Sequence, residues 1–191
     1  MLNSLRLVLS GFFATTGIAH VRWPQGELPA CGWPGSHEWL STRPSPLDSV
    51  QLPLRAGIAK ICYSRPSARG RRIYEDLVPF GRTWRTGANE PTLLYLTAPA
   101  RIGDSVFASG RYVLLTVPGP RQWRVILNTT DETEPAKMFQ SLKPVGMVVA
   151  TVDSLQAPME QFTITPLASS PTGFLLAWGP LGARVTVGSP P

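Results

Sequence analysis

The distribution of proline and glycine limits this chain to short secondary-structure elements. Twenty prolines and seventeen glycines are spread over 191 residues and interrupt the sequence every few positions. Proline lacks a backbone donor and ends helices, and glycine weakens both helices and strands when it falls inside them. Long helices are therefore not expected, and short strands joined by turns are the structure that this spacing favours.

The segments between the turn residues have the composition of β-strands. They are rich in Val, Ile, Leu, Thr and aromatic residues and are bounded by Gly, Pro, Asn or Asp. The predicted fold class is all-β, an antiparallel β-sandwich or a jelly-roll-like domain, with one helical turn and a second candidate turn within Asp131 to Gln140. The predicted strands are Ser49 to Leu54, Ile58 to Tyr63, Thr92 to Thr97, Ser105 to Phe107, Arg111 to Val117, Trp123 to Leu127, Met147 to Val152, Phe162 to Thr165, Phe174 to Trp178 and Arg184 to Val187, and the helical turn is Ile73 to Leu77.

Composition divides the chain into three parts. Residues 1–19 begin with a short positive stretch and continue as an apolar run, which is typical of a signal peptide. The run is shorter than the roughly 20 residues of a spanning helix, so a retained membrane anchor is the less favoured alternative. Residues 20–47 form a Pro/Trp-rich lead without periodicity, which predicts irregular structure. Residues 48–188 are expected to form the single β-domain.

The lead contains three tryptophans, Trp23, Trp33 and Trp39. Three indole rings carry a large apolar area for a free linker, so two arrangements remain open. The lead is draped over its own domain, or these side chains dock on a partner.

Cys31 and Cys62 are the only two cysteines. In an oxidising compartment such a pair forms a disulfide, which here would close a loop of about 30 residues and add roughly 3 kcal/mol of stability. The alternative is that Cys62, inside an apolar strand, is simply a small buried residue. The disulfide is the favoured interpretation because Cys31 lies in a Gly/Pro-rich stretch that little else would order.

Basic residues gather in one block. The net charge is +6, and six arginines fall between Arg65 and Arg85 against two acids, Glu75 and Asp76. Guanidinium groups grip carboxylates and phosphates, so the block predicts an anion or partner site. The alternative is structural: arginines bond loop carbonyls and pair with nearby acids to fasten a long connection onto the sheet. This structural use is favoured for the block as a whole.

Catalytic and metal chemistry finds little support in the sequence. Both histidines, His20 and His37, precede the β-domain, so no Ser-His-Asp arrangement is available there. No Cys/His/Asp cluster has metal-ligand spacing, and no cofactor is predicted. To act as a catalytic residue, Glu90 in the stretch Trp84 to Thr92 would need a second acid. Glu75 and Asp76 are the nearest acids in the sequence. In that stretch Gly87 is expected to take a positive φ and Asn89 to bond its own turn.

Three stretches resemble one bacterial family. They are Tyr63-Ser-Arg-Pro-Ser-Ala-Arg-Gly-Arg71, Leu77-Val-Pro-Phe-Gly81 and Trp84-Arg-Thr-Gly-Ala-Asn-Glu-Pro-Thr92. Together they resemble the family called domain of unknown function 2911, closely from Ser45 to Asn128 and loosely through Val187. The resemblance implies an exported β-rich domain and supplies no activity to transfer. The chain departs from the family pattern over Thr129 to Lys143, where a site present in relatives would be altered.

Three hypotheses about function follow. The first is an exported, extracytoplasmic, non-enzymatic module that binds a protein partner or an anionic ligand through an arginine-rich face. The second is an accessory extracytoplasmic subunit of a membrane-bound complex, and the third an envelope hydrolase using Glu90. Membrane contact is expected only through residues 1–19. Nucleic acid is not expected as a partner, because no recognisable module interleaves lysines with aromatics. The candidate binding residues are Arg65, Arg69, Arg72, Trp84, Arg85, Asn89 and Glu90.

Overall fold

Nine antiparallel strands form one continuous sheet in the computed structural model, which describes residues 28–31, 37–167 and 172–191. The strand order is β1-β2-β3-β6-β7-β8-β9-β4-β5. The all-β prediction is confirmed. The strands are β1 (Leu47–Leu54), β2 (Gly57–Ser64), β3 (Thr92–Leu96), β4 (Ala100–Ile102), β5 (Ser105–Phe107), β6 (Gly110–Val117), β7 (Gln122–Thr129), β8 (Lys143–Pro166) and β9 (Gly173–Gly188), and the helical elements are α1 (His37–Thr42), the π-helix η1 (Ile73–Leu77) and α2 (Pro135–Met138).

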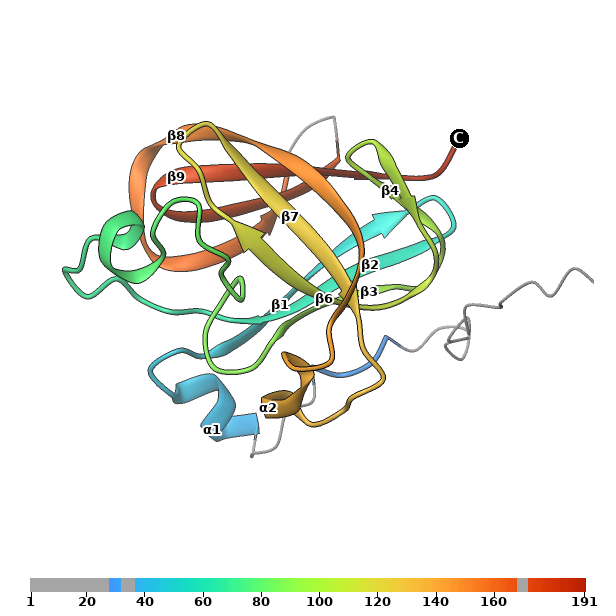
Figure 1. The fold of residues 1–191 in the computed structure, drawn as a ribbon, viewed down its shortest axis with the longest axis horizontal. Helices are drawn as coiled ribbons and strands as arrows, with labels where there is room; N and C mark the ends of the chain where they lie inside the picture. The colour runs from blue at the N-terminus through green and yellow to red at the C-terminus, as the bar shows by residue number, and fades with distance from the viewer. Residues whose placement is uncertain (1–27, 32–36, 168–171) are drawn as a thin grey trace, which may run out of the picture.

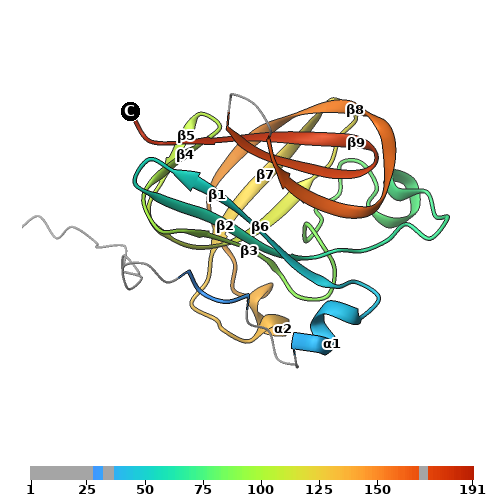
Figure 2. The same cartoon turned by 180° about the vertical axis from the view of Figure 1, so that it is seen from behind.

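The sheet curls over on itself at β8. The first half of this 24-residue strand pairs with β7 and the second half pairs with β9. Register shifts between Ser154 and Thr163 bend the strand, as bulges do. Figures 1 and 2 show β8 and β9 crossing over β1, β2 and β3, with β4 and β5 beside the end of β9. The two halves of one sheet therefore enclose the core between them.

Contacts between β2 and the second half of β8 fasten the two halves together. Past the end of β2, Ser67 forms an isolated bridge with Gln161, and the Phe162 amide donates to the Pro66 carbonyl at 2.8 Å. The buried Tyr63 hydroxyl accepts the Ile164 amide at 2.9 Å. Burial raises the pKa of Tyr63 to about 12.

The interior between the halves is filled by aliphatic and aromatic side chains. Trp123, Phe162 and Phe174 are fully buried or nearly so. A cavity of about 20 Å³ remains, lined only by apolar side chains that include Ile61, Leu94, Leu127, Leu176 and Val185. A space of this size holds about one water molecule, so the interior is a packed core without room for an organic ligand.

A second, smaller apolar cluster lies on the outer face of β2, β3 and β6. Cys62, Leu93, Tyr95 and Val113 project there from the strands. Leu40 of α1, Met138 of α2 and the 28–31 segment cover them. We call this the capped region. The sheet thus has a third layer over part of its outer face, which Figure 1 shows as α1 and α2 beneath the strands.

The structure corrects several sequence-based expectations. The lead is not irregular throughout, because α1 forms a helix at His37–Thr42 whose apolar residue Leu40 packs on the sheet. Two predicted pairs of strands merge into the single strands β8 and β9, and β4 was not predicted. Pro158 is tolerated within β8 because the register pairs none of residues 155–158 with β9. The N–H that proline lacks therefore removes no hydrogen bond between the strands. Residues 1–27, with the expected signal peptide, lie outside the described residues.

Candidate functional site

Arg65 joins β2 to the second half of β8. Its Nη2 donates to the Thr163 hydroxyl at 3.0 Å, and its Nη1 lies 3.3 Å from an oxygen of Asp48 in β1. Nearby, the Glu160 carboxylate accepts the backbone amide of Arg69 at 2.6 Å. The guanidinium of Arg65 thus fastens the start of the arginine block to the sheet, whereas Arg69 makes its contact through the backbone amide, and its exposed guanidinium pairs with no described carboxylate.

The middle of the block is held by local contacts. Arg71 donates to the carbonyls of Ser67 and Ala68 at 3.0 and 2.9 Å. Arg72 pairs with Glu75 and, at 3.4 Å, with Asp76 on the exposed surface of η1. Exposed pairs of this kind contribute little stability, yet they leave neither carboxylate unpaired.

Trp84 belongs to the core and not to a surface site. Its ring stacks on Trp178 with centroids 5.5 Å apart and meets the edge of Phe162 at 4.8 Å. The indole N–H donates to the Gly87 carbonyl at 3.1 Å. The ring therefore fixes the turn that follows it, and its polar atom is already satisfied.

The turn after Trp84 differs from expectation in one detail. Thr86 and Asn89 take the left-handed conformation, each with φ of 60°, while Gly87 does not. Gly87 is needed for close approach instead, because a Cβ there would lie 3.0 Å from the Ser64 carbonyl. Arg85 closes the turn by donating to the Asn89 carbonyl at 2.8 Å.

Glu90 forms a buried ion pair with Arg43, a residue from the lead. Both guanidinium nitrogens bond the carboxylate, at 2.7 and 2.6 Å, and Ser64 adds a hydroxyl at 3.2 Å. The two side chains are only 5% and 14% exposed. Burial by itself would raise the pKa of Glu90, but the hydrogen bonds from Arg43 outweigh it and the pKa lies below its usual value. The pair ties the end of α1 to the sheet.

The proposed hydrolase pair is not assembled. Glu90 is bound to Arg43, whereas Glu75 and Asp76 are paired with Arg72. A glycosidase acid needs a raised pKa, and the pKa of Glu90 is lowered. No group of three or more His, Cys, Asp or Glu residues that could hold a metal is present within the described ranges. The candidate catalytic residues therefore serve as structural contacts.

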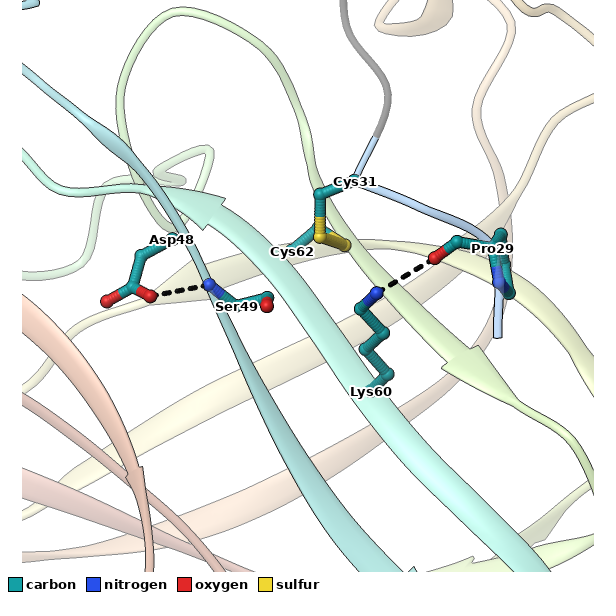
Figure 3. Close-up of a disulfide and its surroundings, with 6 residues drawn as sticks. All are labelled: Pro29, Cys31, Asp48, Ser49, Lys60 and Cys62. Carbon is teal, nitrogen blue, oxygen red and sulfur yellow. Dashed lines mark hydrogen bonds between the residues drawn. A yellow bond between two sulfur atoms is a disulfide. The ribbon is translucent and has the colours of Figure 1, made fainter. Parts of the chain in front are cut away.

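A disulfide joins Cys31 to Cys62 and anchors the lead on the outer face of β2. The two Cα atoms lie 5.6 Å apart. Two residues earlier, the Pro29 carbonyl accepts a bond from Lys60 Nζ at 2.9 Å, as Figure 3 shows beside the disulfide. Burial lowers the pKa of Lys60. These contacts place the described part of the lead on its own domain.

Of the three tryptophans of the lead, the structure describes Trp39 alone. Its ring on α1 is 53% exposed and lies 5.0 Å from the Arg43 guanidinium. Trp23 and Trp33 lie outside the described residues. In the part of the chain that is described, no helix has the length and apolar character needed to span a membrane.

Two arginines with exposed side chains lie at the end of the β6–β7 hairpin. The Gly81 amide donates to the Pro118 carbonyl at 2.8 Å, which places Arg82 against the hairpin loop that carries Arg121. Neither arginine forms an ion pair with any described carboxylate. Phe80, which is 41% exposed, stacks on Tyr74 beside them. We call Phe80, Arg82 and Arg121 the hairpin-end surface.

A family model described as "Protein of unknown function (DUF2911)" matches residues 45–187. The chain belongs to this family. Comparison with curated proteins and with solved structures finds no match. The DUF2911 match begins two residues before β1 and ends one residue before the end of β9, so it takes in all nine strands. Cys31, Arg43 and α1 precede it, and the contacts that close the capped region therefore combine residues inside and outside the DUF2911 match.

Sequence reasoning missed the partner of Glu90 and the hairpin-end surface. Arg43 is 47 positions from Glu90, and no periodicity connects two residues of that separation. Arg121 lies outside the arginine-dense block, so charge density did not select it. One signal was available: the predicted strands Arg111 to Val117 and Trp123 to Leu127 are joined by a short Pro/Gly-rich segment that carries Arg121 with no acid beside it.

Proposed function

We propose that this DUF2911 protein is an exported, non-enzymatic binding module that holds an acidic protein partner at the hairpin-end surface. One observation carries the proposal: Arg82 and Arg121 are exposed, lie at the same end of the sheet and form no ion pair with a described carboxylate. Arginine beside an exposed aromatic ring is the composition typical of binding hot spots. This moves the predicted arginine-rich face from Arg65, Arg72 and Arg85 to Arg82 within the block and Arg121 beyond it.

The contacts of the other arginines support this choice of surface. Hydrogen bonds within the chain engage the guanidinium groups of Arg65, Arg71 and Arg85. Releasing Arg65 and Arg71 for a ligand would leave two half-buried acceptors, the Thr163 hydroxyl and the Ala68 carbonyl, without this donor, which costs about 1–3 kcal/mol for each group. Arg82 and Arg121 carry no such cost.

Export is supported by two features. The composition of residues 1–19 is that of a signal peptide, and the disulfide suits an oxidising compartment. The expectation is a mature extracytoplasmic chain that begins near His20. Cell fractionation followed by intact-mass measurement of the native protein tests it, and a cytoplasmic chain with reduced cysteines would contradict it.

Binding is tested with a defined acidic probe. The purified protein is titrated into a fluorescein-labelled decaglutamate peptide, and the dissociation constant is read from anisotropy at two salt concentrations. Arg82→Glu with Arg121→Glu is expected to weaken binding at least tenfold. Arg55→Glu with Arg101→Glu changes the net charge equally at exposed positions elsewhere and is the matched control.

Three outcomes would overturn the proposal. The decaglutamate peptide does not bind, the control variant loses as much affinity as the test variant, or inorganic phosphate competes at equal concentration. The last result would make the site one for a small anion.

A further inference from the structure

A stripe of aliphatic side chains crosses the outer face of β6, β7 and β8. Leu115, Ile126 and Met147 are directly opposite one another in the register of the three strands. One step along, Val149 is opposite Arg124. Met147 and Val149 are 50% and 52% exposed. Directly paired residues share a face, so these side chains form one contiguous surface, which we call the open stripe.

The open stripe continues the face that is covered in the capped region. Val113 is buried against Met138, while Leu115, two residues along the same strand and on the same face, is only half-buried. The apolar character of the face extends past the last covering residue. Scattered exposed aliphatic residues are ordinary, but a contiguous set across three strands marks a surface for contact.

The charges around the open stripe indicate what covers it. Arg124 lies within it and pairs with none of the described carboxylates. The acids of β8 are already engaged, because Asp153 pairs with Arg184 and Glu160 accepts the Arg69 amide. The unmatched charge is therefore positive.

Two possible occupants from this chain fit that charge poorly. A second copy packed stripe to stripe would bring another Arg124, and the open stripe itself contains no carboxylate. Residues 1–27 contain two arginines and a single acid, Glu27. Electrostatic complementarity instead requires a surface that supplies carboxylates.

We propose that the open stripe binds an amphipathic segment of an acidic partner protein. The aliphatic side chains of that segment would lie on Leu115, Ile126 and Met147, and one of its carboxylates would pair with Arg124. The inference deepens the proposed function and rests on it for the acidic character of the partner, because β7 leads from Arg121 of the hairpin-end surface directly into the open stripe.

Site-specific photo-crosslinking in cells that make the protein tests the inference. p-Benzoylphenylalanine replaces Met147 in one variant and Val106 in the other. Val106 is 56% exposed on β5 and is the matched control. The expected result is an adduct at position 147 and none at 106, with mass spectrometry placing the crosslink in an acidic amphipathic segment of a second protein.

A substitution inside the open stripe checks the charge pairing. Arg124→Glu is expected to reduce the yield of the adduct at position 147 at least fivefold, and Arg124→Lys to retain most of it. Circular dichroism and thermal melting of the purified variants establish that each is folded, so that a lost adduct reports lost binding.

Other results would overturn the inference. These are an adduct with a second copy of the chain, with residues 1–27, with lipid or with a protein that lacks acidic residues at the crosslink, or no adduct at all. The proposed function fails separately. If Arg82→Glu with Arg121→Glu abolishes decaglutamate binding while Arg124→Glu leaves the adduct unchanged, the hairpin-end surface stands and the open stripe does not. If Arg124→Glu removes the adduct while Arg82→Glu with Arg121→Glu leaves decaglutamate binding unchanged, the open stripe stands and the hairpin-end surface does not.

Discussion

Two neighbouring regions of the sheet's outer face, about 10 Å from each other, differ in whether the chain covers them. In the capped region the chain covers apolar side chains with α1, α2, a disulfide and a buried ion pair. In the open stripe it leaves equally apolar side chains uncovered and places an unpaired arginine among them. Covering this face therefore takes several long-range contacts, and the chain provides them on one side only.

The largest expected effect breaks the ion pair of the capped region. Glu90→Ala leaves the Arg43 guanidinium buried without its carboxylate, and removal of one partner of a buried pair costs about 3–5 kcal/mol. Urea unfolding followed by tryptophan fluorescence measures the loss. Asp153→Ala is the matched control, because it breaks an exposed pair with Arg184 and should cost less than about 1 kcal/mol. Equal losses in the two variants would show that the Arg43–Glu90 pair is not special.

Removing the disulfide is expected to have the next largest effect. Cys31→Ser with Cys62→Ala frees a loop of about 30 residues in the unfolded state, with a loss of roughly 3 kcal/mol. Reduction of the wild-type protein should reproduce the loss, measured by the same urea titration. If binding of decaglutamate falls as well, the capped region and the hairpin-end surface are coupled and do not act independently.

Acidification should act on the capped region before it acts on the open stripe. The pKa of Glu90 is lower in the folded protein than in the unfolded chain, so its contribution is complete above the unfolded value near 4.5. The contribution is lost as the pH falls through the folded pKa. Stability measured between pH 6 and pH 3 should therefore decline more steeply in the wild type than in Glu90→Gln. Parallel curves would contradict the assignment.

Substitutions in the open stripe should have the smallest effect on stability. Met147→Gln with Val149→Thr replaces exposed apolar groups, and surface changes of this kind stay within about 0.5 kcal/mol. The adduct of the crosslinking experiment, placed at Ile126 in this variant, should nevertheless be lost. A large loss of stability would mean that the open stripe is already covered by the chain itself.

Most strands could be predicted from the sequence, and the curl of the sheet could not. The β2 and β6 segments are dense in β-branched and aromatic residues and have turn residues at both ends, so local preference and final structure agree. β8 was predicted as two strands, Met147 to Val152 and Phe162 to Thr165. In the structure one strand runs through both, with register shifts between Ser154 and Thr163. Local composition contains no information about such register shifts.

The candidate site was predictable in part. The fastening contacts of Arg71 and Arg72 are local, with partners three or four residues away, and bonds to loop carbonyls and nearby acids were predicted from the sequence. The partner of Glu90 comes from another part of the chain and depends on where α1 lies. The open stripe could not be predicted because Met147 to Val152 is apolar on both faces. Alternation of apolar and polar residues therefore does not reveal which side chains face outward.

The length of β8 bears on how the molecule unfolds. One backbone segment contributes hydrogen bonds to both halves of the sheet, and Tyr63, Arg65 and Gln161 join its second half to β2. Separation of the halves would therefore break ladder bonds in both of them at once. The two sheets of a sandwich can separate at the loops that connect them, whereas the two halves of this sheet share the strand β8. Its amide protons should exchange as one cooperative unit, with no half retaining protection after the other has opened.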